Sequence, residues 1–338
     1  MVQTTTQHQT NLNHKLVLVT GGAGFVASHL IDKLLDLGAR VVGVDNFVTG
    51  RKQNLPQHPD FKFIEADAIQ PPEQYLVKPE LDLDQPKFDY IFHLASPASP
   101  PRYQEYPQVT YRVNTFGTDR LLEYLKKTNP QGKFIYASSS EVYGDPEVHP
   151  QTEDYWGNVN PNGVRSCYDE GKRMGETICG VYTREFDIDV RIARIFNTYG
   201  PRLNPQDGRV ISNFIKQALA HQSISIYGDG AQTRSYCFVA DLVVGLIELA
   251  TNPSAKGQTL NLGNPDEYTV IKTAEIIWQA VTGESIRSNQ IQYMNLPGDD
   301  PARRQPDISK AQELLGWSPQ VTFADGLKRT VEFFRKNE

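Results

Sequence analysis

The chain has 338 residues, 39% of them hydrophobic, and a formal net charge of −6 at pH 7. That length and composition provide a sizeable core. The acidic balance excludes a general polyanion binder, because affinity for phosphate backbones comes from clustered Lys and Arg, so we expect no nucleic-acid partner.

Cysteine, histidine and hydropathy patterns exclude further classes of protein. The three cysteines form no CxxC pair and the seven histidines lack ligand spacing, so we expect a reducing compartment and no metal site. No apolar run approaches the length that spans a bilayer, and residues 1–14 lack the apolar centre of a signal peptide. We therefore expect no membrane partner, a cytoplasmic protein and a disordered lead-in over residues 1–14.

From Lys15 to about Thr198, short apolar runs alternate with amphipathic stretches. The apolar runs predict β-strands, and the stretches with a helical period predict α-helices. The expected strands cover residues 16–21, 40–45, 61–67, 88–95, 133–140 and 189–196, and the expected helices cover 25–38, 113–127 and 168–186. Strands and helices that take turns predict an α/β fold, with a Rossmann-like doubly wound parallel sheet in a domain over residues 15–198.

Beyond Gly200 the pattern changes. Pro and Gly become frequent, and helices expected at 210–222, 270–283, 308–316 and 323–337 are separated by short strands at 223–228 and 258–263. This predicts a smaller C-terminal lobe over residues 199–338, from which some segments return to the first domain. The Pro-rich, acidic stretch at 71–87 is interpreted as a surface loop.

The stretch TGGAGFVASHL places Gly21, Gly24 and Ala27 between the first strand and the first helix. Such a turn needs Gly where the backbone bends and where it approaches a pyrophosphate, and a small third residue lets helix and strand pack closely. Asp45 ends the next strand, where it would accept hydrogen bonds from an adenosine ribose and repel a 2′-phosphate. The pattern predicts NAD in preference to NADP; the alternative is a set of packing glycines with a strand-end acid.

The stretch YDEGK contains a second chemical pattern. Tyr168 and Lys172 are four residues apart, so on a helix they share one face. A neighbouring ammonium would lower the pKa of the phenol enough for it to take a proton from a sugar hydroxyl. The pair resembles the active-site pair of the short-chain dehydrogenase/reductase superfamily, and this resemblance implies that a hydroxyl at the end of the preceding strand hydrogen-bonds the same sugar, with Ser139 and Ser140 in KFIYASSS as the candidates. A lone YxxxK also occurs by chance, so the pair gains weight from the fingerprint that precedes it.

Seven blocks carry a resemblance to a known family: HLASPASPP, SSSEVYGDPEVHPQTEDYWG, CYDEGKRMGET, RIFNTYGPR, DGRVISNFI, YGDGAQTRSY and RRQPDI. Together with the fingerprint they resemble the extended short-chain dehydrogenase/reductase superfamily and, within it, the UDP-glucuronate decarboxylases, also called UDP-xylose synthases. The similarity runs from Lys15 to about Lys336. The first two blocks separate this family from its epimerase and dehydratase relatives.

The resemblance implies a reaction in which NAD stays tightly bound and is recycled. Hydride leaves C4 of the glucuronate, Tyr168 takes the hydroxyl proton, and the resulting β-keto acid loses carbon dioxide. C5 is then protonated and C4 is reduced again, which converts UDP-glucuronate to UDP-xylose. The resemblance also implies a homodimer, joined through helices that begin near Val109 and Tyr168.

The resemblance gives Glu141 and Arg304 their roles. Glu141 would lie beside sugar C5 and C6, where it would destabilise the charged ground state and order a water for protonation. Arg304 matches an arginine associated with the substrate carboxylate. Ser140 stands where dehydratases carry an Asp acid, so water elimination would lack its acid. The alternatives are a helix cap for Glu141 and a surface ion pair for Arg304.

Binding residues follow from the same resemblance. The catalytic set is Tyr168, Lys172, Ser139, Ser140, Glu141 and Arg304. The cofactor set is Gly21, Gly24, Phe25, Val26, Asp45, Asn46, Phe47, Thr49, Gly50, Asp67, Ala68, Leu94, Ala95, Ser96, Tyr168, Lys172, Thr198 and Arg209. The substrate set is Arg112, Glu141, Tyr168, Asn197, Ile211, Asn213, Phe214, Ile215, Tyr227, Gly228, Arg234 and Arg304.

The sequence departs from the family pattern at four positions: Ala27, Ser139, Arg112 and Gln305. The first three keep size, hydroxyl or charge, whereas Gln305 loses a cation next to Arg304. Two alternatives stay open within enzymes, a UDP-sugar 4-epimerase and a 4,6-dehydratase. An alternative from another class is a catalytically silent NAD-binding regulatory protein, although such proteins usually lose the Tyr and Lys pair.

Overall fold

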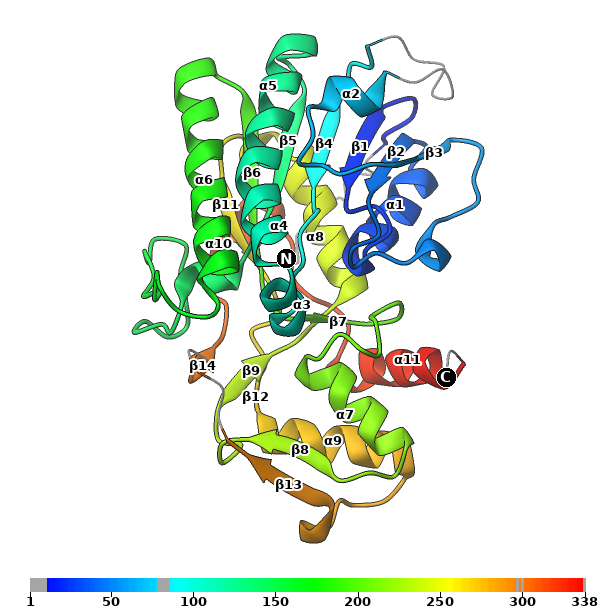
Figure 1. Ribbon diagram of the computed structural model, residues 1–338, viewed down its shortest axis with the longest axis vertical. Coiled ribbons are helices and arrows are strands. Elements are labelled where there is room, and N and C mark those ends of the chain that lie inside the picture. The colour runs from blue at the N-terminus through cyan, green and yellow to red at the C-terminus, as the bar shows by residue number, and fades with distance from the viewer. Residues whose placement is uncertain (1–10, 78–84, 296–297, 299–300, 337–338) are drawn as a thin grey trace, which may run out of the picture.

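The computed structural model describes residues 11–77, 85–295, 298 and 301–336. Within these residues the protein has two parts, a large sheet covered by helices and a smaller lobe at the foot of the sheet (Figure 1). No helix of the described residues is long and apolar enough to cross a membrane.

The large sheet has seven parallel strands in the order β11-β6-β5-β4-β1-β2-β3. Its strands are β1 Leu16–Thr20, β2 Arg40–Asp45, β3 Phe61–Glu65, β4 Tyr90–His93, β5 Lys133–Ser139, β6 Asp189–Ile195 and β11 Thr259–Leu262. The chain winds outward in one direction from β1 to β3 and in the other from β4 to β6. This is the predicted doubly wound α/β fold, and its switch point lies between β1 and β4.

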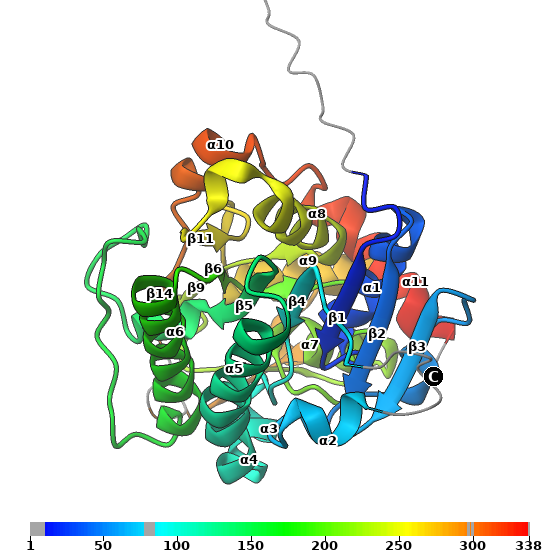
Figure 2. The ribbon, with the colours of Figure 1, turned by 90° about the horizontal axis from the view of Figure 1, so that it is seen from above.

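Helices cover both faces of this sheet (Figure 2). On one face lie α1 Phe25–Asp36, α8 Val239–Thr251 and α10 Ser309–Leu315. On the other lie α2 Pro72–Leu76, α5 Thr118–Thr128 and α6 Ser166–Phe186. Most of the strands are therefore buried from both sides, which is why they appear in the sequence as nearly continuous apolar runs, whereas the edge strand β3 is only partly buried.

Shorter helical segments connect these elements. They are η1 Lys52–Asn54, α3 Pro100–Glu105, α4 Pro107–Arg112, the π-helical turn η3 Val113–Gly117, η4 Ser140–Tyr143, η5 Pro253–Ala255 and η6 Ser288–Gln290. The predicted helix at 113–127 therefore starts as a π-turn. The ring of the buried His93 lies 3.1 Å from the carbonyl oxygen of Val113 and hydrogen-bonds it, at the residue where the π-turn begins.

The second lobe has its own apolar core. Its helices are α7 Val210–Leu219, α9 Val270–Thr282 and α11 Phe323–Lys336. Three small sheets accompany them: β8 Ile224–Tyr227 with β13 Ile291–Met294, β7 Thr198–Tyr199 with β10 Cys237–Phe238, and β9 Thr233–Ser235 between β12 Glu267–Thr269 and β14 Arg303–Arg304.

Segments after residue 198 do return to the large sheet, since β11, α8 and α10 complete it. A domain boundary at residue 198 stays a prediction. Residues 1–10 of the expected lead-in, and 78–84 of the expected surface loop, lie outside the described residues. The prediction of disorder is wrong for residues 11–14, because Leu12 is buried and its amide donates to the carbonyl of Leu37.

Candidate active site

A cavity of about 740 Å³ opens between the carboxyl ends of the strands and the second lobe. A smaller cavity of about 70 Å³ lies next to it, over the ends of β1, β2 and β4. Ligands of doubly wound sheets bind at this edge, next to the switch point. The predicted catalytic residues all line the larger cavity.

The glycine turn after β1 forms one wall of both cavities. Gly21 has a φ of +73°, and a Cβ there would lie 2.9 Å from the backbone of Ala95, so no other residue fits this turn without strain. Gly24 precedes α1, no side chain caps the helix, and its first turn holds no acidic residue. The first amides of α1 are thus available to an anion such as a pyrophosphate.

Asp45, the last residue of β2, is hydrogen-bonded to the glycine turn. The Asp45 carboxylate accepts hydrogen bonds from the amides of Ala23, at 3.0 Å, and Phe47, at 2.7 Å. Burial raises the pKa of Asp45, although these amide donors oppose the shift. Asp45 and Asp67 both line the smaller cavity. The glycine turn and the uncapped start of α1 fit the pyrophosphate of NAD. Asp45 and Asp67 fit its adenosine.

Helix α6 brings Tyr168 and Lys172 into the larger cavity. Tyr168 stacks on Tyr103, with ring centroids 5.1 Å apart, and hydrogen-bonds Ser139 at the end of β5. The Lys172 ammonium donates to the carbonyl of Ala137 at 2.6 Å and lies 5.7 Å from the centre of the Tyr168 ring. The phenol, the hydroxyl and the ammonium therefore meet where the sequence predicted.

The predicted effect of Lys172 on Tyr168 is not what this structure shows. Burial raises the pKa of Tyr168 to about 12, and the hydrogen bond from Ser139 only partly offsets that rise. Burial also lowers the pKa of Lys172 to about 7. Both groups lose water around their charged forms, and this loss is the largest cause of each pKa shift. The prediction counted the attraction between the charges and left out the dry environment that both residues share.

A carboxylate cluster lies beside this pair. Glu141, in η4, forms ion pairs with Arg304 of β14 and with Arg165, which precedes α6. Arg304 is 2% exposed and also donates to the carbonyl of Gly144 at 2.8 Å. Burial alone would raise the pKa of Glu141, but Arg304 and Arg165 outweigh it and hold the pKa at about 2. Glu141 is thus the anion between two arginines, which we call the cationic pocket, and its side chain does not act as a helix cap. Arg304 is buried in this pocket, so its ion pair is not a surface pair.

Sequence reasoning missed Arg165. The only signal was its position, three residues before Tyr168, and an isolated arginine in a loop is usually a solvated side chain. Arg304 has a second arginine beside it, because β14 pairs with β9 so that Arg304 lies opposite Arg234. Both are buried and both line the larger cavity, so the small sheet presents two cations to a ligand.

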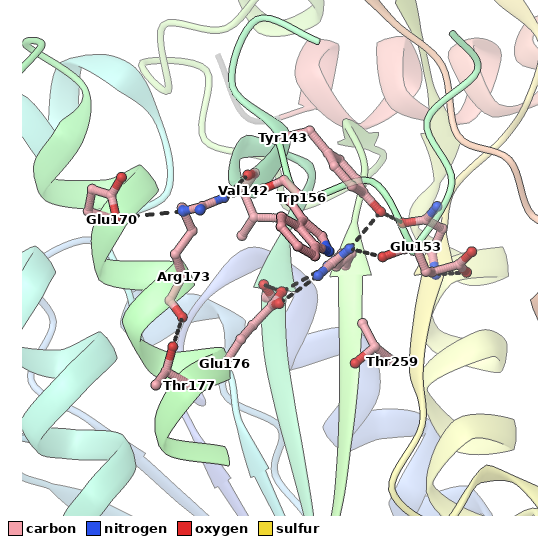
Figure 3. A network of polar contacts seen from close by, with 12 residues as sticks. Val142, Tyr143, Glu153, Trp156, Glu170, Arg173, Glu176, Thr177 and Thr259 are labelled. Atoms are coloured by element: carbon pink, nitrogen blue, oxygen red, sulfur yellow. Dashed lines mark hydrogen bonds and ion pairs between the residues drawn. The ribbon is translucent and has the colours of Figure 1, made fainter. Parts of the chain in front are cut away.

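A polar network holds the segment that follows Glu141, and Figure 3 shows its contacts around Tyr143, Arg173 and Glu176. Arg194 of β6 makes a two-pronged contact to Glu176 of α6, at 3.0 and 2.8 Å, and donates to the Tyr143 hydroxyl at 3.0 Å. Ser138, the residue before Ser139, donates to the same Glu176 carboxylate at 2.5 Å. Arg173 of α6 also holds this segment, by donating to the carbonyls of Val142 and Trp156. The network joins α6, β6 and the end of β5.

Most of the predicted binding residues gather around the two cavities. The cofactor residues that line one or both are Gly21, Gly24, Phe25, Val26, Asp45, Asn46, Thr49, Gly50, Asp67, Ala68, Leu94, Ala95, Ser96, Thr198 and Arg209. The substrate residues there are Asn197, Ile211, Asn213, Phe214, Tyr227 and Arg234, with the catalytic six.

Four predicted binding residues do not line either cavity. Arg112 is exposed on α4, with its guanidinium 5.9 Å from the ring centre of Tyr111. Ile215 is buried in the core of the second lobe. The Phe47 ring packs on Phe63, and Gly228 directly follows Tyr227, the last residue of β8. Their binding roles stay predictions.

Comparison with known proteins agrees with this geometry. Residues 17–263 match the model of the NAD dependent epimerase/dehydratase family. UDP-glucuronic acid decarboxylase 1 of Xenopus tropicalis is 47% identical over 96% of this chain and 73% of its own length. UDP-glucuronic acid decarboxylase 4 of Arabidopsis thaliana is 48% identical over 95% of this chain and 68% of its own.

Solved structures show the same fold with nucleotide sugars. The UDP-glucose 4-epimerase of Thermotoga maritima, determined with UDP-glucose, has a TM-score of 0.84 at 30% identity and covers 95% of this chain and 99% of its own. A UDP-glucuronic acid 4-epimerase of Bacillus cereus, in complex with UDP-glucuronic acid and NAD, has a TM-score of 0.81 at 30% identity over 96% and 100% of the two chains.

The fold and the Tyr168/Lys172 pair define a short-chain dehydrogenase/reductase of the extended type. The comparisons specify the branch. The chain belongs to the NAD dependent epimerase/dehydratase family and, within it, to the UDP-glucuronic acid decarboxylases.

Proposed function

We propose that this protein decarboxylates UDP-glucuronate to UDP-xylose. The observation that carries the proposal is the cationic pocket of Arg304 and Arg165 beside Tyr168 and Lys172 in one cavity. A sugar oxidised at C4 needs the phenol and ammonium, and a sugar with a carboxylate at C5 needs the arginines.

The cofactor site adds the redox chemistry. The turn at Gly21 and Gly24 would hold the pyrophosphate of NAD, and Asp45 would hold its adenosine ribose. When bound, NAD would supply the acceptor, and later the donor, of the hydride exchanged with C4 of the sugar. Lys172, which donates to the carbonyl of Ala137, would orient the nicotinamide ribose and stabilise the Tyr168 phenolate.

Tyr168 would take the proton of the C4 hydroxyl, and Ser139 would hold that hydroxyl in line. Arg304 would bind the C5 carboxylate, since its buried Nε has no hydrogen-bond partner among the described residues while Nη1 holds Glu141. Glu141 would then face the substrate carboxylate across one guanidinium. That close approach of two anions favours loss of carbon dioxide.

The nucleotide would be gripped from the second lobe. Arg234 and Arg209 suit the diphosphate because a guanidinium binds two oxygens at once. Asn197, Phe214 and Tyr227 line the same cavity and would supply polar and aromatic contacts for uridine. The 4-epimerase alternative shares this nucleotide site and the Tyr168/Lys172 pair. An epimerase of neutral sugars would have no carboxylate for Arg304, whereas an epimerase of UDP-glucuronate would use the same arginine and is distinguished by its product, UDP-galacturonate.

A proton NMR time course tests the proposal. The purified protein is mixed with UDP-glucuronate, with and without added NAD. We expect UDP-xylose and carbon dioxide, and product without added NAD would indicate retained cofactor. Unchanged UDP-glucuronate, or conversion only to UDP-galacturonate, would overturn the decarboxylase proposal.

A homodimer and a cytoplasmic location remain predictions. Exposed apolar side chains support the dimer, because Tyr111 of α4, Phe116 of η3, and Met174 and Val181 of α6 lie along the helices predicted to meet a second copy. Met174 and Val181 are seven residues apart and share one helical face. Sedimentation of wild type and of Met174→Asp measures the oligomeric state.

A further inference from the structure

Gln151 is a buried residue of the loop between η4 and α6, and the proposed chemistry gives it no role. It is 0% exposed and lines neither cavity. Its backbone amide and carbonyl and both polar atoms of its side chain all form hydrogen bonds. A buried glutamine with every polar group satisfied is held in one orientation, because any other would leave buried groups without partners.

Three of these hydrogen bonds join Gln151 to the backbone that directly follows Arg304. The Gln151 amide donates to the carbonyl of Gln305 at 2.9 Å, and the Gln151 Oε1 accepts from the Gln305 amide at 2.9 Å. The carbonyl of Gln151 accepts from the Asp307 amide at 2.8 Å. The Nε2 of Gln151 donates to the carbonyl of Val148 at 2.8 Å. Gln151 thus binds the backbone after Arg304 to its own loop.

The strand that carries Arg304 can do little to position it alone. Strand β14 has two residues, and among the described residues it pairs only with β9, at the edge of its small sheet. So short a parallel pairing supplies few hydrogen bonds. Before β14, the Ala302 amide donates to the Asp145 carboxylate at 3.0 Å. Asp145 and Gln151 belong to the loop that follows Glu141, so this loop holds β14 at both ends.

We propose that Gln151 is a positioning residue, which sets the distance of the Arg304 guanidinium from Glu141 and from the carboxylate of the sugar. The inference rests on the proposed function, since it concerns how the same arginine meets the same substrate. The Arg304 guanidinium pairs with Glu141 and donates to the carbonyl of Gly144 at 2.8 Å. Gln151 lies outside the cavities, so it acts through the backbone that carries Arg304.

The consequence of losing the Gln151 side chain should be selective for acidic sugars. The Gln305 amide would lose its acceptor, and the backbone after β14 would shift to find another. Arg304 would then move relative to the sugar carboxylate, and a contact between a guanidinium and a carboxylate weakens steeply when its geometry is lost. A ligand with the same nucleotide and no carboxylate should respond less.

Gln151→Met tests this role, because Met keeps the length of the side chain and removes both of its hydrogen bonds. Calorimetric titration with UDP-glucuronate and with UDP-xylose is carried out at saturating NAD, in a Tyr168→Phe background so that the substrate is not consumed. We expect Gln151→Met to raise the Kd of UDP-glucuronate about tenfold more than the Kd of UDP-xylose. Equal changes for the two ligands, or no change, would overturn the positioning role.

A double-mutant cycle with Arg304 separates positioning from general destabilisation. In Arg304→Met the positioned group is absent, so the addition of Gln151→Met should change the Kd of UDP-glucuronate by less than about twofold. An effect of Gln151→Met that keeps its full size without the arginine would overturn the proposal, because Gln151 would then not act through Arg304.

Asn252→Leu is a matched control on the large sheet. The Asn252 carboxamide also accepts from a backbone amide, that of Ser254 at 3.0 Å, and donates to a backbone carbonyl, that of Leu314 at 3.0 Å. It lines neither cavity. This variant should change both Kd values by less than about twofold. A selective loss of UDP-glucuronate binding here as well would trace the effect of Gln151→Met to lowered stability and overturn its special role.

Hydrogen exchange keeps the inference testable if Gln151→Met does not fold. Because coupling is reciprocal, a carboxylate bound at Arg304 should strengthen the hydrogen bonds that hold the residues after it. Exchange in residues 301–308, followed by mass spectrometry in Tyr168→Phe, should slow more with saturating UDP-glucuronate than with saturating UDP-xylose. Equal protection would overturn the role of Gln151 and leave the decarboxylase proposal intact. Binding of UDP-xylose without any binding of UDP-glucuronate would overturn the proposed function instead.

Discussion

Replacement of Glu141 by Gln tests the cationic pocket most directly. The pKa of Glu141 falls from 4.5 to about 2 because Arg304 and Arg165 outweigh the effect of burial. A shift of this size corresponds to about 3 kcal/mol of folding free energy. Because the folded pKa is depressed, this stabilisation is complete above pH 4.5 and is lost as the pH falls from 4.5 to about 2.

We therefore expect Glu141→Gln to lower the free energy of unfolding at pH 7 by about 3 kcal/mol, since it also leaves two buried guanidinium groups without an anion. Urea unfolding at pH 7 and at pH 4 measures the effect, and the loss should be smaller at pH 4. In the same variant kcat should fall by at least about 100-fold, while UDP-xylose binding is retained. A stability loss below about 1 kcal/mol, equal at both pH values, would refute the ion-pair reasoning.

Four further substitutions test other parts of the site. Tyr168→Phe should abolish turnover and leave NAD bound, which the absorbance of the denatured supernatant measures. Gly21→Ala, at a φ of +73° and 2.9 Å from the Ala95 backbone, should cost about 1–2 kcal/mol of stability and release NAD on gel filtration. Arg165→Met should weaken UDP-glucuronate binding about 30-fold or more, and UDP-xylose binding much less. Glu176→Gln should destabilise the protein by about 3 kcal/mol in urea, and a double variant with Arg194→Met should recover part of the loss.

The architecture could be predicted from the sequence because its signals are local. The strands of the large sheet other than the edge strand β3 are buried on both faces, so they appear as apolar runs, and each covering helix shows a helical period. The fingerprint could be recognised because the backbone at Gly21 admits no other residue without strain. Asp45 could be recognised because it ends the strand that follows the fingerprint. Tyr168 and Lys172 were recognisable because four residues make one turn of a helix.

The remainder depends on contacts between distant residues. Arg165 acquires meaning only when η4 and β14 bring Glu141 and Arg304 next to α6. Burial is also invisible in a motif, which is why the sequence predicted a lowered pKa for Tyr168 and the structure raises it to about 12. The position of Arg112 on the exposed side of α4 depends on how that helix turns against α6.

Most of the residues proposed to act in the reaction come from one part of the fold, and one comes from the other part. Ser139, Glu141, Arg165, Tyr168 and Lys172 all come from the stretch between β5 and the start of α6. Arg304 alone comes from β14, a two-residue strand held by β9. The residues proposed for oxidation thus lie on one segment, and Arg304, proposed to bind the acidic group of the sugar, joins Glu141 and Arg165 from another. Substitutions around β14 would therefore change the contact to that acidic group while leaving Tyr168, Ser139 and Lys172 in place.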